Sequence, residues 1–171
     1  MILWHAGVAT FIVYATLGRR RVDYRFIVLG AVLPDGVDAI VNLVWLHEPA
    51  GRSVAHTLVA VIAVAVVILL FFRGERRLAV FGLAVGWLLH LVGDGMWQAP
   101  RTLYWPAFGS EFALRPSEPY TWGLFTHPFD HALTWAGELV GLAVLAWFYV
   151  AFRLGEPDRR RLFTRDGLLR A

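Results

Sequence analysis

Cysteine is absent from this chain of 171 residues, and so is lysine, because all sixteen basic residues are arginine. Without cysteine the chain can form neither a disulfide nor a thiolate metal site. Charged residues make up only 17% of the sequence, whereas about 25% is usual in soluble globular domains. This shortage of charge argues against an ordinary soluble fold.

Apolar residues are correspondingly abundant in the sequence. They make up 58% of the chain, against about 45–50% in a typical soluble domain, and the mean hydropathy is +0.56. Eight Trp and twelve Phe add bulk that suits lipid and the membrane interface. The net charge of +3 comes from arginines placed in short runs between apolar segments. Membrane orientation explains this pattern better than nucleic-acid binding, so we expect no nucleic-acid partner.

Five apolar runs are candidates for membrane-spanning helices, which need about 17–25 residues each. The runs are Ile2–Leu17, Phe26–Leu46, Val54–Phe72, Leu78–Met96 and Ala132–Phe152. The first run lacks the basic start and the clear cleavage site of a signal peptide, so we interpret it as a retained span. The sequence therefore predicts an all-α, polytopic transmembrane helical bundle of about five spans, forming one domain over residues 1–171.

The arginines predict how this bundle is oriented, because basic residues concentrate in cytoplasmic connections. Thirteen of the sixteen follow the first, third or fifth run: Arg19, Arg20, Arg21, Arg25, Arg73, Arg76, Arg77, Arg153, Arg159, Arg160, Arg161, Arg165 and Arg170. Only Arg52, Arg101 and Arg115 fall in the other connections. We therefore predict the N-terminus outside and the C-terminus inside, with 97–131 as an outer interfacial loop and 154–171 as a basic cytoplasmic tail.

The segment Leu88–Pro106 contains the pair of residues around which we expect the site to form. His90 and Asp94 are four residues apart at the end of an apolar run, so on a helix they lie on one face and can hold a single metal ion. Gly82 and Gly86 continue this stripe backwards. Small residues at this spacing predict the close approach of another helix.

The remaining polar residues of the apolar runs gather in the same half of the predicted membrane. Under the predicted topology the outer half contains His5, Asp35, Asp38, Asn42, His56, His90, Asp94 and Glu138, with His127 and His131 just before the fifth run. Pro34 disturbs its helix and frees backbone groups that a buried site can use. Ionisable groups at membrane depth are costly and mark functional sites. We expect one polar pocket, open to the outer face, whose imidazoles and carboxylates suit zinc, manganese or iron, with zinc favoured.

Each of these residues also has an ordinary structural interpretation. Histidines at span ends, such as His5, His47 and His127, often form interfacial hydrogen bonds, and an arginine such as Arg52 often extends to the membrane boundary. A transporter with an ion path, or a structural membrane protein whose polar cluster locks the helices, would use the same residue types. A transporter predicts ionisable residues in the inner half as well, and the first four runs have none beyond Asp35 on that side.

The order of these motifs is similar to that of a known family. The motifs are His5, Leu33-Pro34-Asp35 with Asp38, Arg52 with His56, His90-x-x-x-Asp94, and Trp105-Pro106. Over roughly residues 1–106 the chain resembles the bacterial membrane-bound metal-dependent hydrolase family, which includes a LexA-regulated inner-membrane member. Two positions depart from its pattern: Gly51 stands where the family usually has His, and the second Asp comes one residue later. The segment HLVGD is also distantly similar to zinc-dependent phospholipases C.

The resemblance implies a bacterial inner-membrane enzyme that hydrolyses a phosphoester or lipid-linked substrate at the outer leaflet, with membrane lipid as its partner. Its divalent metal would be bound by His56, His90, Asp94 and Asp35, with Asp38 and His5 completing the site or holding a second ion. Asp38 or Glu138 is the candidate general base. Arg52 is the candidate group for holding an anionic part of the substrate.

Overall fold

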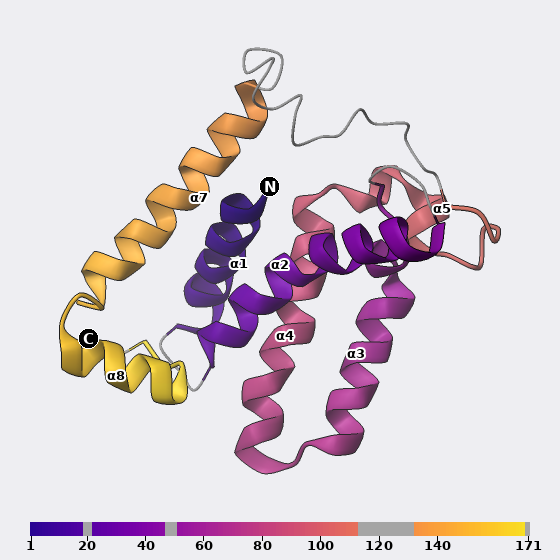
Figure 1. Ribbon diagram of the computed structural model, residues 1–171. Coiled ribbons are helices and arrows are strands. Elements are labelled where there is room, and N and C mark those ends of the chain that lie inside the picture. The colour runs from indigo at the N-terminus through magenta and orange to yellow at the C-terminus, as the bar shows by residue number, and fades with distance from the viewer. Residues whose placement is uncertain (19–21, 47–50, 113–131, 170–171) are drawn as a thin grey trace.

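The computed structural model describes residues 1–18, 22–46, 51–112 and 132–169, and within these ranges it contains helices and turns but no strand. Figure 1 shows their arrangement. The elements are α1 (Ile2–Leu17), α2 (Tyr24–Val41), the π-helical turn η1 (Asn42–Leu46), the 3-10 turn η2 (Val54–His56), α3 (Leu58–Phe71), α4 (Gly74–Gly93), the 3-10 turn η3 (Met96–Gln98), α5 (Pro100–Leu103), α7 (Ala132–Ala151) and α8 (Pro157–Asp166). The prediction of an all-α fold is confirmed.

Three helices of the described chain are long and apolar enough to cross a membrane: Tyr24–Val44, which joins α2 to η1, Gly74–Gly93 and Ala132–Ala151. The apolar helices α1 and α3 have 16 and 14 residues, fewer than the roughly 17 that a bilayer requires. Large apolar side chains face outward, as lipid contact requires; Leu70, Leu139 and Val150, for example, are 68%, 63% and 73% exposed. The total of five spans and their orientation stay predictions.

The helix predicted to begin at Val54 begins later, and this boundary was wrong. Val54–His56 forms a 3-10 turn, and α3 begins only after Thr57. Thr57 has an extended backbone, and its Oγ1 accepts a hydrogen bond of 3.1 Å from the backbone N–H of Ala60. A threonine in this position caps a helix N-terminus and separates it from the preceding turn. His56 therefore lies on a turn above α3.

The fourth apolar run also ends earlier than predicted. Helix α4 ends at Gly93, with Asp94 as its cap, and Gly95 follows in the left-handed conformation at φ 63°. A left-handed glycine ends a helix because the helical hydrogen-bond ladder cannot continue through it. The backbone N–H of Asp94 still bonds to the carbonyl of His90 at 2.9 Å, so the expected spacing of four residues is kept.

Glycines bring α2 and α4 into close contact. A Cβ atom added to Gly30 would lie 2.1 Å from the carbonyl oxygen of Leu83, and one added to Gly86 would lie 2.2 Å from that of Ile27. Both distances are far too short for a side chain. A Cβ at Gly82 would meet Ile27 at 3.2 Å. The predicted close approach along this stripe is confirmed, and α2 is the helix that approaches.

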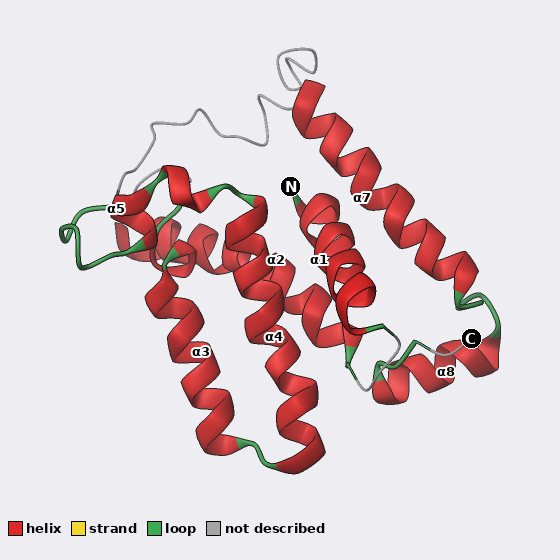
Figure 2. Ribbon diagram, turned by 180° about the vertical axis from the view of Figure 1, so that it is seen from behind, coloured by secondary structure: helices red, strands yellow, loops and turns green. Residues whose placement is uncertain are grey.

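Helix α7 packs on the other side of α1 through a second glycine contact, where a Cβ at Gly141 would lie 2.1 Å from the carbonyl of Leu3. Tyr24, Ala9 and Phe148 belong to the core that joins α2, α1 and α7. Figures 1 and 2 show that α8 and the α3–α4 connection lie at the opposite end of the molecule from the N-terminus and α5. The predicted tail thus contains a folded helix, α8.

Candidate metal centre

Four acidic and imidazole side chains meet near the end of the bundle that holds the N-terminus and α5. Asp35 comes from α2, His56 from η2, His90 from the last turn of α4, and Asp94 is the cap of α4. One ligand atom of each lies within 4.8 Å of those of the other three. Both imidazoles are buried, while the Asp35 side chain is 40% exposed and forms the open edge. We call these four residues the His/Asp group.

Five of the six separations within the His/Asp group lie close to those of a tetrahedral metal site. The two Nε2 atoms of His56 and His90 are 3.1 Å apart, and each lies 3.5 Å from Oδ1 of Asp35. Oδ2 of Asp94 is 3.3 Å from the first ring and 3.8 Å from the second. Tetrahedral bonds of about 2.0–2.1 Å place ligand atoms about 3.3–3.4 Å apart. The observed separations fall on both sides of this value.

Hydrogen bonds at the far side of each ring fix which nitrogen faces the group. Nδ1 of His90 lies 2.8 Å from the carbonyl oxygen of Ala31, and since a carbonyl only accepts, this nitrogen donates. Nδ1 of His56 lies 2.7 Å from Oδ2 of Asp38. Asp38 also accepts from the backbone N–H of Ser53 and of Ala55, as an ionised carboxylate does. In neutral rings both Nε2 lone pairs therefore point into the His/Asp group.

Such an arrangement suits a cation at its centre. Two carboxylates and two facing lone pairs repel one another, and burial makes this repulsion more costly than it is in water. One shared proton would leave a net charge of −1, whereas a divalent ion makes the group neutral. Imidazole and carboxylate ligands suit zinc, manganese or iron. The residues present thus fit a divalent metal.

Local sequence features bring these side chains together. Gly86 lets α4 pack directly on α2, and His90, one turn later, reaches the carbonyl of Ala31. Pro34 lacks an N–H group, which removes one hydrogen bond from α2 beside the group. On the other side, Nε1 of Trp87 donates to the carbonyl of Ala55 at 2.7 Å and holds the turn that carries the second imidazole.

Two predicted site residues, His5 and Arg52, contact Asp94 from outside the group. His5 Nε2 lies 3.1 Å from Oδ1 of Asp94, and Arg52 Nε lies 2.8 Å from Oδ2. His5 is 3% exposed, and its ring lies 3.9 Å from that of His90 between centroids. Among the described residues its Nδ1 has no hydrogen-bond partner. Arg52 is half-exposed, so its charge lies at the mouth of the site.

Glu138, the remaining predicted residue, lies on α7 and outside the His/Asp group. Its Oε2 accepts a hydrogen bond of 2.7 Å from the backbone N–H of Leu3, which joins α7 to the start of α1. The amino group of Met1 lies 3.7 Å from Asp35 and 3.9 Å from Glu138. The structure therefore places this carboxylate at the edge of the site, on the side of Asp35.

Sequence reasoning missed the backbone groups that build the site, and it missed Trp87 as an anchor. The carbonyls and N–H groups of Ala31, Ser53 and Ala55 carry no signal in residue type. A further unpredicted bond joins Nδ2 of Asn42 to the carbonyl of Gly51 at 2.5 Å. The predicted residues His47, Arg115, His127 and His131 lie outside the described residues.

Fold and site together define a helical multi-pass membrane protein with a buried His/Asp group capable of binding a metal. The family described as YdjM inner membrane protein matches residues 1–157, and the chain belongs to this family. It is therefore a multi-pass protein of the bacterial inner membrane. The family's description states a location and no reaction. No curated protein and no solved structure matches the chain.

Proposed function

We propose that this protein is a membrane-embedded, metal-dependent hydrolase that acts on a phosphoester of a lipid or lipid-linked substrate at the membrane surface. The observation that carries the proposal is the convergence of four ligand atoms from Asp35, His56, His90 and Asp94, all within 4.8 Å of one another. Metal sites with such ligands recur in enzymes that hydrolyse esters and phosphoesters. The predicted orientation would place this chemistry at the outer leaflet.

A divalent ion bound by the His/Asp group would supply Lewis-acid chemistry, polarising the scissile phosphoester and acidifying water. Asp38 supports the group from behind, because it holds His56 through Nδ1 and is itself fixed by two backbone N–H groups. Carboxylates in this position orient a ligating imidazole and increase its basicity. Asp38 is 2% exposed, which leaves no room for substrate or water at its oxygens. We therefore assign it to positioning.

Glu138 is then the remaining candidate for the general base. Its carboxylate is at the edge of the site, next to the exposed Asp35, and its side chain is 17% exposed. One of its oxygens accepts from the backbone N–H of Leu3, and the other lies 3.9 Å from the amino group of Met1.

Arg52 gives the site its preference for an anion. Its guanidinium contacts Asp94, and 46% of its side chain is exposed. With a divalent ion present, the two carboxylates of the His/Asp group are neutralised, so Arg52 makes the mouth positive. A guanidinium binds phosphate oxygens through charge-assisted hydrogen bonds, and this is why we favour a phosphoester over an uncharged ester.

The proposal is tested with purified protein in detergent, incubated with phosphatidic acid and with lipid-linked phosphoesters in the presence of zinc, manganese or iron. We expect phosphate release by the wild type, none by His90→Ala, and wild-type release by Asp158→Asn, which removes an exposed carboxylate from α8. Hydrolysis that persists in His90→Ala would contradict the proposal. If no phosphoester is hydrolysed and His90→Ala only lowers stability, the cluster is a structural lock between helices.

A further inference from the structure

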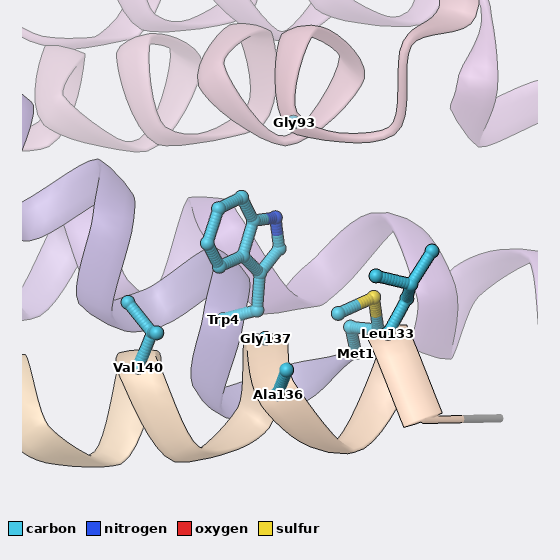
Figure 3. A pocket seen from close by; sticks show the side chains of 7 residues that line it. All are labelled: Met1, Trp4, Gly93, Leu133, Ala136, Gly137 and Val140. Atoms are coloured by element: carbon cyan, nitrogen blue, oxygen red, sulfur yellow. The ribbon is translucent and has the colours of Figure 1, made fainter. Parts of the chain in front are cut away.

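An apolar groove runs along the contact of α1 with α7 and begins next to the His/Asp group. The part nearest the His/Asp group is an open depression of about 370 Å³, lined by Met1, Trp4, Gly93, Leu133, Ala136, Gly137 and Val140. Figure 3 shows the indole of Trp4 between Gly93 on one side and the α7 residues on the other. The groove is thus formed by three helices, α1, α4 and α7.

Gly93 connects this groove to the metal centre. It directly precedes Asp94, and a Cβ atom added to it would lie 3.0 Å from Nδ1 of His5 and 3.5 Å from Nε1 of Trp4. His5 is buried, and Nδ1 has no hydrogen-bond partner among the described residues. Because Gly93 has no side chain, its backbone lies directly against Trp4, which lines the groove, and against His5, which contacts Asp94.

The groove continues along α7 away from the site. A second apolar depression of about 310 Å³ is lined by Phe11, Ala143, Val144 and Trp147, and it shares Val140 with the first. From Leu133 to Trp147 the helix rises about 21 Å at about 1.5 Å per residue. One leaflet contributes about 15 Å of a hydrocarbon core that is about 30 Å thick. The two depressions together are therefore long enough for a lipid chain that crosses one leaflet.

Resting on the proposed function, we propose that this groove binds one hydrocarbon chain of an anionic phospholipid substrate and presents its phosphoester head group to the metal centre. Apolar walls and the small residues Gly93, Ala136 and Gly137 suit a flexible alkyl chain. The head group matches the positive charges near this end: Met1, whose amino group lies 3.7 Å from Asp35, lines the groove, and Arg52 contacts Asp94 beside Gly93. The substrate class is thus a membrane phospholipid with a phosphate close to its chains, such as phosphatidic acid.

The test uses phosphatidic acid that carries a diazirine in the middle of one acyl chain, added to the full-length protein in phosphatidylcholine nanodiscs. Photolabelled peptides are located by mass spectrometry, with and without an excess of unlabelled phosphatidic acid. Val140→Trp fills the part shared by both depressions. Leu142→Trp is the matched control, because it lies on the same helix with 49% exposure against 50% for Val140 and lines neither depression.

We expect saturable labelling of α1 and α7 peptides, reduced about tenfold by Val140→Trp, as when about two methylene groups leave the groove, and unchanged by Leu142→Trp. Circular dichroism and gel filtration, equal for all three proteins, confirm that they are folded. Labelling that does not saturate, or that falls equally in both variants, would show that the probe reports ordinary boundary lipid. The proposal that the groove binds a substrate chain would then be refuted. If the protein hydrolyses a phosphoester but shows no saturable labelling, only the lipid-binding role of the groove is refuted. If labelling is saturable but no phosphoester is hydrolysed, the enzymatic function is refuted and the groove remains a lipid-binding site.

Discussion

Replacing Asp38 by asparagine tests whether this buried carboxylate positions the metal ligand His56. Three donors converge on its two oxygens: Nδ1 of His56 at 2.7 Å, the N–H of Ala55 at 2.7 Å and the N–H of Ser53. An asparagine has one oxygen and one NH2 group, so in either orientation of the amide at least one of these donors faces another donor. The replacement keeps the volume of the side chain and removes only its charge and one acceptor.

The expected effect has two parts. Leaving one buried donor unpaired costs about 1–3 kcal/mol of folding stability. Losing the partner that orients a ligating imidazole typically lowers metal affinity about 10- to 100-fold, which corresponds to about 1.4–2.7 kcal/mol of binding free energy. Both parts follow from the contacts of Asp38, because its own oxygens lie behind the ring of His56 and away from the ligand atoms of the group.

Metal affinity is measured by competition with a chromophoric chelator, and stability by thermal unfolding of the metal-free protein. Asp158→Asn serves as the control, since it removes an exposed carboxylate far from the site, and we expect it to leave both quantities unchanged. If Asp38→Asn lowers the unfolding temperature but binds metal as tightly as the wild type, the carboxylate only stabilises the fold. The positioning role would then be refuted.

Three further predictions concern packing, the turn that carries the site, and the candidate base. Gly30→Ala forces a Cβ onto a backbone carbonyl of α4 and is expected to lower the free energy of unfolding, measured by thermal unfolding, by about 1–3 kcal/mol. In the control Gly36→Ala nothing lies within 4 Å of the new Cβ, so this variant is expected to be neutral or stabilising. Equal effects of the two substitutions would contradict the close contact of α2 with α4. Trp87→Phe removes the bond to Ala55, costs about 1 kcal/mol and weakens metal binding in the chelator assay, and unchanged affinity would argue against its role as an anchor. Glu138→Gln keeps an oxygen for its backbone bond, so stability should hold while phosphate release falls; full activity would exclude it as the base.

Much of the architecture follows from residue patterns. The length and composition of the apolar runs predict helices, and the structure has them. The stripe of Gly82 and Gly86 predicts a close helix partner, because small residues are the simplest way to bring two backbones together. The spacing of His90 and Asp94 by one helical turn predicts that they share a site, and both belong to the His/Asp group.

Other features depend on groups that every residue carries. The carbonyl of Ala31 orients His90, and the N–H groups of Ser53 and Ala55 hold Asp38, which orients His56. The residue types at these positions do not indicate that their backbone groups are used in this way. The break before α3 was missed because Val54 and Ala55 read as the start of the apolar run, whereas the capping geometry of Thr57 separates the turn Val54–His56 from the helix. The groove depends on where α7 packs, which periodicity along one helix does not specify.

The central claim is that the His/Asp group binds a divalent metal, and the metal content of the purified protein tests it most directly. Elemental analysis would compare the wild type with His90→Ala, Asp94→Ala and the control Asp158→Asn, each matched for folding by circular dichroism and gel filtration. We expect stoichiometric zinc, manganese or iron in the wild type and the control, and loss of the metal from both site variants. A folded wild type that contains no metal and takes none up when it is supplied would contradict the account.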